Sequence, residues 1–240
     1  MGYLVDASKA KNRNPMNKTP GPWSYSGIKL YDTCPRKYQS EKVTKEVKFT
    51  DTEATLYGKE IHTVCEEYIR DNKDVPAKHD YLRPYLDKLK AIPGDKHCEI
   101  KVGVKKEDGR LVACDYDDAG VWFRGICDLA ILNGTKGFVV DYKTSKNARY
   151  ADMRQLKLMA AALFLKFPEL EKIKLMLLFV VSKETVTDEV TVERGLDIFS
   201  TLHELLTQRE MSYNTDVWNP KQNPLCRRWC RSQCEHNGSL

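Results

Sequence analysis

The stretch Val121-Trp122-Phe123-Arg124-Gly125-Ile126-Cys127-Asp128-Leu129-Ala130-Ile131-Leu132, followed by Asn133-Gly134 and then by Gly137-Phe138-Val139-Val140-Asp141-Tyr142-Lys143, decides the fold of this chain. Both apolar segments are rich in β-branched, aromatic and aliphatic residues, which favour strands, and Asn-Gly is a two-residue hairpin signal. We therefore predict antiparallel strands over 121–132 and 137–142, joined by a tight turn. In such a hairpin Asp128 and Asp141 can approach each other.

Asp128, Asp141 and Lys143 are charged residues within these largely apolar strands. An unpaired buried charge is costly, and a cation or a hydrogen-bonding partner is the usual remedy. Mg²⁺ binds through one or two protein carboxylates, so two aspartates suffice to begin a site. Lys143 shares a strand face with Asp141, where it could orient or deprotonate a water or neutralise a phosphate. Solvated strand ends are the alternative, and the hairpin alone favours neither interpretation.

Composition indicates a soluble globular protein. The chain has 240 residues, 41% hydrophobic and 30% charged, and a formal net charge of +5. This length allows one large domain with a substantial core. No apolar run approaches the roughly 18 residues of a membrane-spanning helix, and no secretory signal is evident at the N-terminus. We therefore expect no membrane association and a cytoplasmic, reducing location.

Basic residues gather near both ends of the chain. Residues 1–22 are rich in Asn, Pro and Gly, which predicts a flexible or irregular N-terminal arm. The basic residues of the two ends are Lys9, Lys11, Arg13, Lys18, Lys29, Arg227, Arg228 and Arg231. Such groups could follow a nucleic-acid backbone, although solubility alone would also explain them.

The order of elements predicts a single α/β domain over residues 23–240, with a central mixed sheet flanked by helices on both faces. A helix capped by Ser24 or Ser26 should bend or restart at Pro35. Further helices are predicted over 52–68, 81–91, 151–167 and 196–210, and strands over 98–104, 110–116, 121–132, 137–142 and 175–182.

Eight cysteines in a reducing compartment are not expected to form disulfides. Cys65, Cys98, Cys114 and Cys127 are scattered through predicted core elements and are interpreted as small buried hydrophobes. Three of the remaining cysteines form a dense group in the C-terminal tail over 226–236: Cys226, Cys230 and Cys234. His236 follows two residues after Cys234.

Five motifs in order resemble the PD-(D/E)XK nuclease superfamily, and more narrowly its RecB-type branch, which includes Cas4 and many phage exonucleases. They are Ser24-Tyr25-Ser26 with Tyr31 and Cys34-Pro35-Arg36-Lys37-Tyr38, then Gly58-Lys59-Glu60-Ile61-His62, then Gly125-Ile126-Cys127-Asp128, then Asp141-Tyr142-Lys143, then Gln155. The resemblance covers Ser24 to Cys234 and implies a restriction-endonuclease-like core.

The resemblance also implies a Mg²⁺ or Mn²⁺ centre, whose ligands would be His62, Asp128, Asp141 and the backbone carbonyl of Tyr142. Lys143 would be the catalytic lysine, and Gln155 would contact the DNA strand or position that lysine. Met159 stands where the family's Q-x-x-x-Y motif has tyrosine. Glu99 is a further candidate carboxylate. A lone helical histidine such as His62 is more often a core or surface residue, but the two aspartates favour the ligand interpretation.

Tyr31 and Tyr38, together with Arg36 and Lys37, mix aromatic and basic groups near the N-terminus. This mixture suits contact with a nucleic-acid strand by stacking and charge. An amphipathic helix packed on the sheet explains the tyrosines equally well.

In the Cas4-like relatives one early cysteine joins three C-terminal cysteines around a 4Fe–4S cluster, and the resemblance implies Cys34 as that early ligand. The spacing C-x3-C-x3-C here departs from the usual C-x2-C-x5-C. A Zn²⁺ site completed by Cys34 or His236, or no metal at all, stay open as alternatives. Any such link would tie the N-terminal helix to the C-terminus and close a channel around single-stranded DNA.

We therefore expect a divalent-metal-dependent DNA exonuclease that hydrolyses phosphodiester bonds in single-stranded DNA or at free DNA ends, in recombination, repair or replication. A catalytically weak or inactive DNA-binding adaptor with the nuclease fold is one alternative. A structural metalloprotein whose carboxylates only stabilise the sheet is another. DNA is the expected partner, and the sequence does not indicate protein partners.

Overall fold

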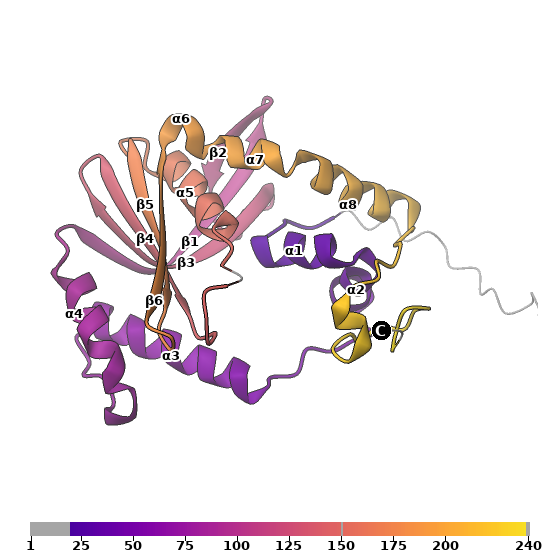
Figure 1. Ribbon diagram of the computed structural model, residues 1–240. Coiled ribbons are helices and arrows are strands. Elements are labelled where there is room, and N and C mark those ends of the chain that lie inside the picture. Colours follow the sequence, from indigo (N-terminus) through magenta and orange to yellow (C-terminus); the bar gives the residue numbers. More distant parts are fainter. Residues whose placement is uncertain (1–19, 150, 239–240) are drawn as a thin grey trace, which may run out of the picture.

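A six-stranded mixed sheet forms the centre of the computed structural model, which describes residues 20–149 and 151–238 (Figure 1). The strand order is β2-β1-β3-β4-β5-β6, and neighbouring strands are antiparallel except for the parallel pair β4 and β5. The bounds are β1 Asp95–Glu107, β2 Arg110–Cys114, β3 Val121–Asn133, β4 Lys136–Lys143, β5 Lys172–Phe179 and β6 Glu184–Thr191. The predicted single α/β domain with a mixed sheet is confirmed.

Helices cover both faces of the sheet, as predicted. The α-helices are α1 Tyr25–Thr33, α2 Pro35–Tyr38, α3 Glu53–Arg70, α4 Arg83–Ala91, α5 Arg154–Lys166, α6 Val192–Gly195, α7 Asp197–Thr201 and α8 His203–Thr215. On one face α3 and α4 bury Ile61 and Leu86 in a cluster with Val140, and on the other α5 buries Leu163 in a cluster with Val139. Each such fully buried side chain contributes roughly 1.5–3 kcal/mol.

The hairpin between β3 and β4 is present, with its turn shifted by one residue. Asn133 pairs with Lys136, so Gly134 and Thr135 form the two-residue loop instead of Asn133 and Gly134. Gly134 has φ +56°, a conformation that glycine adopts without steric cost. The last ladder pair at the other end is Leu129 with Val140, which places Asp128 opposite Asp141 one position further on.

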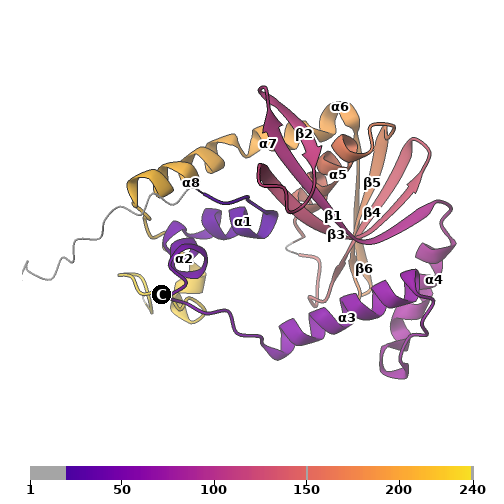
Figure 2. The same ribbon diagram turned by 180° about the vertical axis from the view of Figure 1, so that it is seen from behind.

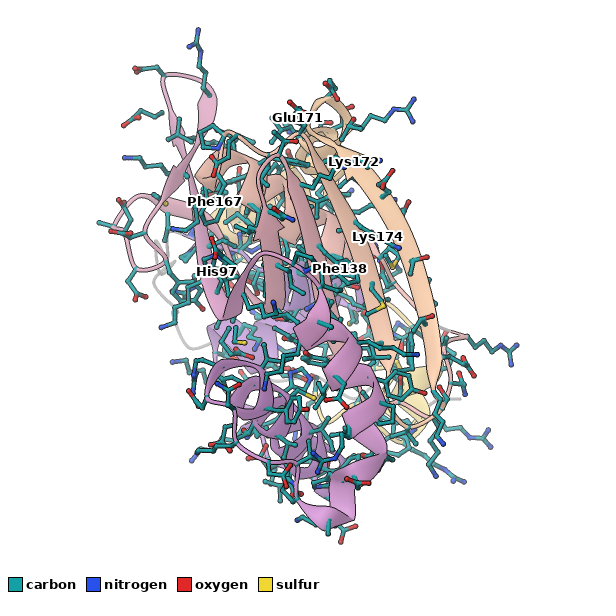
Figure 3. The ribbon with its side chains drawn as sticks, turned by 90° about the vertical axis from the view of Figure 1, so that its left-hand side faces the viewer. His97, Phe138, Phe167, Glu171, Lys172 and Lys174 are labelled. Carbon is teal, nitrogen blue, oxygen red and sulfur yellow. The ribbon has the colours of Figure 1, made fainter. Side chains whose placement is uncertain are left out.

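The parallel pair β4 and β5 fixes where the charged residues of β4 lie. Both strands begin at one end of the sheet, where Lys136 pairs with Lys172, and α5 is the connection between them. Phe138 of β4 and Lys174 of β5 mark this starting half of the strands in Figure 3. Asp141 and Lys143 therefore lie toward the opposite end, where β4 finishes.

The N-terminal helix begins and breaks where the sequence predicts. Ser24 caps α1 by accepting a hydrogen bond from the Gly27 N–H at 3.3 Å, and Pro35 restarts the chain as α2 after an extended Cys34. Trp23, just before α1, pairs with Phe123 of β3 through an isolated bridge. This bridge sets α1 beside the sheet next to Gly125.

The predictions for residues 182–215 were incomplete. Strand β6 was not predicted, because Val186 and Val190 are the apolar residues of an otherwise polar edge strand. The helix predicted over 196–210 is instead two helices, α7 and α8, which extend to Thr215, and the short helix α6 precedes them. The predicted helix over 52–68 matches α3, whose N-cap is Thr52.

A second packing unit joins the N-terminal helices to the C-terminal segment. Tyr31 of α1, Tyr38 of α2 and Trp218 form a buried aromatic cluster, with Tyr213 of α8 packed against it. Figures 1 and 2 show α8 running from the sheet to this unit, where the C-terminal segment lies beside α2. The N-terminal helix and the C-terminal segment, which we expected from the sequence to be tied together, are therefore in contact.

The predicted N-terminal arm, residues 1–22, lies almost wholly outside the described residues. Of the four cysteines predicted to be buried, Cys65 and Cys127 are buried, whereas Cys98 and Cys114 are half-buried. Across residues 20–149 and 151–238, no helix combines the length and apolar character needed to cross a membrane.

Candidate metal and catalytic site

The side-chain alternation of two neighbouring strands breaks at Glu99 and Asp128. On β3, Cys127 belongs to the core beneath α5 but Leu129 belongs to the core beneath α3, although residues two apart in a strand normally share a face. Glu99 lies on β1 between residues that pair with Cys127 and Leu129, and has φ +50°. Strained non-glycine backbone of this kind clusters at functional sites. The interruption frees both carboxylates from the core packing.

His62 of α3 joins Asp128 and Tyr142 at this interruption. Its Nε2 lies 2.9 Å from the Tyr142 carbonyl oxygen and its Nδ1 lies 3.3 Å from Oδ2 of Asp128. The Tyr142 N–H donates to the same carboxylate oxygen at 2.9 Å. The predicted ligands His62, Asp128 and the Tyr142 carbonyl are thus brought together.

Both imidazole nitrogens of His62 face oxygen acceptors. Burial alone lowers the pKa of His62, but the hydrogen bond with Asp128 and the charges of Asp128 and Asp141 outweigh it, so the pKa is raised. The neighbouring carboxylates of the metal-free protein thus favour the imidazolium form of the ring. A metal ion bound through this ring would replace that proton.

Glu99 completes a group with metal-ligand geometry. Ligand atoms of His62, Glu99 and Asp128 all lie within 4.8 Å of one another. Burial and the negative charge of Asp128 raise the pKa of the Glu99 carboxyl group. One imidazole with carboxylate and carbonyl oxygens suits hard divalent cations such as Mg²⁺ or Mn²⁺.

Asp141, also a predicted ligand, is held by Lys143. Its side chain is buried, and its Oδ2 lies 2.7 Å from the Lys143 ammonium as an ion pair, yet this oxygen makes no hydrogen bond of normal geometry among the described residues. Burial and the charge of Asp128 raise the pKa of Asp141 to about 6, against the opposing effects of Lys143 and His62. Asp141 is not part of the group whose ligand atoms all lie within 4.8 Å of one another, and its carboxylate is instead paired with Lys143.

Gln155 of α5 fixes the other side of the lysine. Lys143 Nζ donates a hydrogen bond to Gln155 Oε1 at 3.1 Å. Asp141 and Gln155 therefore hold the ammonium between β4 and α5. This geometry suits the positioning role predicted for Gln155.

A cavity of about 540 Å³ adjoins Gln155. It lies between α1, β3 and α5, and Leu225 of the C-terminal segment also lines it. Its basic and aromatic lining residues are Lys29, Lys37, Arg124, Tyr25 and Tyr116. Among these, Arg124 and Tyr116 were not predicted as site residues, although Arg124 directly precedes the Gly125 motif.

Met159 packs where the family motif has tyrosine. It is buried and lines the cavity, and a Cβ atom placed on Gly125 would lie 2.3 Å from Met159 Cε. The glycine of the Gly-Ile-Cys-Asp motif thus makes room for this methionine.

The aromatic residues of the N-terminal motif have a structural role. Tyr31 and Tyr38 are 3% and 5% exposed, which excludes stacking on a base in this conformation. Arg36 donates to the Gln233 carbonyl oxygen at 3.2 Å and so binds the C-terminal segment. Among Tyr31, Arg36, Lys37 and Tyr38, the residue that lines the cavity is Lys37.

The four predicted cluster cysteines lie in the same N-terminal and C-terminal unit. Cys34 is buried and its Sγ accepts a hydrogen bond from the Lys221 N–H at 3.4 Å; Cys226 is also buried. Arg36 binds the residue next to Cys234. No three of these sulfur atoms lie within 4.8 Å of one another in the described chain. Four thiolates bound to one Zn²⁺ ion would have their sulfur atoms closer to one another than this. In a 4Fe–4S cluster each thiolate binds a different iron atom, so the thiolate sulfur atoms lie further apart.

Comparison with known proteins places the chain in a family. Residues 22–237 match the PD-(D/E)XK nuclease superfamily, and the chain belongs to it. It is therefore a nuclease-fold protein with a candidate acidic metal site.

Two solved structures are similar to the chain. A candidate exonuclease of Eubacterium rectale has a TM-score of 0.54 at 12% identity, over 97% of this chain and 95% of that one. The protein SSO0001 has a TM-score of 0.45 at 17% identity, over 92% of this chain and 88% of that one. A comparison with curated protein sequences gives no match.

Proposed function

We propose that this protein is a divalent-metal-dependent DNA exonuclease of the RecB type, acting on single-stranded DNA or free DNA ends. The observation that carries the proposal is the position of Lys143. Its ammonium contacts both Asp141 and Gln155, and so stands between the carboxylate group and the basic cavity. A lysine so placed can act on a phosphate that is held between metal and cavity.

The metal would be held by His62, Asp128, Asp141 and the Tyr142 carbonyl, with Glu99 as a further carboxylate. When bound there, Mg²⁺ or Mn²⁺ would act as a Lewis acid on the scissile phosphate and make water a better nucleophile. The convergent ligand atoms of His62, Glu99 and Asp128 support this set, and Asp141 is included in it on the resemblance to the family.

The chain's own groups orient the reactants. Asp141 and Gln155 fix the Lys143 ammonium, which reduces the entropy lost when it engages a phosphate oxygen or the attacking water. Lys29, Lys37 and Arg124 in the cavity would neutralise neighbouring phosphates of the strand. The negative charge of a scissile phosphate is thereby balanced on two sides.

The size of the cavity favours a single strand. A volume of about 540 Å³ lies in the range of small-molecule pockets. It admits nucleotides of one strand, while α1 and Leu225 line its wall. A duplex would have to separate before its end could enter.

The cysteines support a further part of the proposal, a 4Fe–4S cluster held by Cys34, Cys226, Cys230 and Cys234. The hydrogen bonds between the α1–α2 region and the C-terminal segment bring the two cysteine-bearing segments together. Anaerobically purified protein should be brown and contain iron, and the Cys34→Ser variant should lose both. Colourless protein with one zinc atom, or with no metal, would exclude the cluster.

The buried Met159 favours one competing function, a DNA-binding protein that retains the fold but cleaves weakly. Single- and double-stranded DNA, labelled at the 5′ or 3′ end, should be incubated with and without Mn²⁺. Cleavage by the wild-type protein that Asp141→Ala and Lys143→Ala abolish supports the exonuclease, and product lengths report polarity. DNA binding without metal-dependent cleavage by the wild-type protein would support the competing function.

A further inference from the structure

Two aromatic side chains are exposed at a second, smaller cavity. Phe49 and Trp229 are 79% and 75% exposed, well beyond what is usual for residues of this size. Both line a cavity of about 200 Å³ between the segment that follows α2 and the C-terminal segment. The cavity is lined by Glu41, Lys42, Val47, Lys48, Phe49, Thr50, Trp229 and Arg231. We call it the Trp229 cleft.

The Trp229 cleft is basic. Lys42, Lys48 and Arg231 have no ion-pair partner among the described residues; Arg231 contacts the Thr50 hydroxyl at 3.4 Å. Glu41, its acidic lining residue, is engaged with Lys37 at 3.8 Å. The cleft thus offers uncompensated positive charge beside two flat apolar rings.

The Trp229 cleft adjoins the larger cavity at Gln155. Lys37 lines the larger cavity and Glu41 lines the cleft, and these two residues form an ion pair one helical turn apart. On the opposite wall, Leu225 lines the larger cavity and accepts a hydrogen bond at 2.9 Å from the N–H of Trp229. The same two segments of the chain therefore line both spaces.

We propose that the Trp229 cleft binds nucleobases of the DNA strand whose scissile phosphate lies at Lys143, a subsite that rests on the proposed function. Basic groups with exposed aromatic rings are the combination that binds single strands without sequence preference, by stacking and phosphate contact. Contact with a protein partner is the competing outcome of the test.

Binding is measured by fluorescence anisotropy of labelled oligothymidine with EDTA present, so that cleavage does not contribute. Phe49→Ala and Trp229→Ala should each weaken the binding of a 20-nucleotide strand about tenfold. An abasic strand of equal length should bind both variants and the wild-type protein alike. Met211→Ala, which removes another exposed apolar side chain outside both cavities, is the control and should bind like the wild type.

The lysines test the charge contribution separately. Lys42→Ala and Lys48→Ala should each reduce the slope of log affinity against log salt by about 0.7 for a single strand. Lys174→Ala on β5, at the starting end of the sheet in Figure 3, should leave the slope unchanged.

The outcomes separate this subsite from the exonuclease assignment. Wild-type binding and cleavage that Phe49→Ala and Trp229→Ala leave unaltered would overturn the subsite alone. A wild-type protein that neither binds nor cleaves DNA would overturn the proposed function together with the subsite.

Discussion

Lys143 and Asp141 form an ion pair along one face of β4, with Nζ 2.7 Å from Oδ2, although Asp141 is 3% exposed. The charge of Asp128 and the burial of the site oppose ionisation of Asp141, and Lys143 only partly offsets them. In the metal-free protein, Lys143 and His62 therefore do not fully offset the burial of Asp141 and its repulsion by Asp128. Such a site loses stability to gain affinity for a cation.

Asp141→Asn should stabilise the metal-free protein at pH 8. The pKa of Asp141 is raised from 3.8 to about 6, so its ionisation destabilises the fold fully above about pH 6 and not at all below pH 3.8. The gain should reach up to about 3 kcal/mol at pH 8 and shrink between pH 6 and 4. Urea unfolding in EDTA measures it. Asp188→Asn is the control: Lys157 lowers the pKa of Asp188, so this variant should not gain stability at pH 8.

Gln155→Ala should lower kcat about ten- to hundredfold with a smaller change in KM, because Lys143 loses the acceptor that fixes its ammonium. Steady-state cleavage of a labelled single strand at saturating Mn²⁺ measures both constants. Lys157→Ala, on the same helix but paired with Asp188, should cleave like the wild type. An unchanged kcat in Gln155→Ala would mean that Asp141 positions the lysine alone.

Glu99→Gln should weaken Mn²⁺ binding about tenfold, since it removes one negative charge from the group around His62 and Asp128. Isothermal titration calorimetry without DNA gives the Kd. Glu107→Gln, an exposed carboxylate at the far end of the same strand, serves as the control. Equal Kd values for the two variants would remove Glu99 from the metal site.

Gly125→Ala should destabilise the protein by about 1–3 kcal/mol, because the new methyl group would overlap the buried end of Met159. Thermal unfolding measures the loss. Adding Met159→Ala should reduce the cost of the glycine substitution, as a double-mutant cycle would detect. Gly21→Ala, where no atom lies within 4 Å of the new methyl group, should be neutral. If Gly125→Ala destabilises the Met159→Ala protein as much as it destabilises the wild type, the strain lies in the backbone and not in the contact with Met159.

Local patterns predict much of this structure. The hairpin of β3 and β4, the Thr52-capped helix α3 and the break at Pro35 follow from neighbouring residues, so the sequence shows them. The approach of His62 to Asp128 was predicted through the family motifs rather than from periodicity.

Other features depend on distant contacts. Strand β6 has few apolar residues, and its partner β5 supplies the hydrogen bonds that define it. Tyr31 and Tyr38 are buried by Trp218, about 180 residues away in the chain, so an N-terminal pattern cannot distinguish core from surface. The break in side-chain alternation at Glu99 and Asp128 also cannot be predicted from the sequence, because the side chains of each strand alternate regularly on either side of it.

The candidate metal and catalytic residues and the C-terminal residues that line the two cavities lie far apart in the order of synthesis. His62, Asp128, Asp141 and Lys143 all precede residue 144, whereas Leu225 and Trp229, which line the two cavities, belong to the segment bound to α1 and α2. The contact between Cys34 and Lys221 spans 187 residues. The candidate metal ligands are therefore all synthesised before the C-terminal segment, and loss of residues 221–234 would remove Leu225 from one cavity and Trp229 and Arg231 from the other.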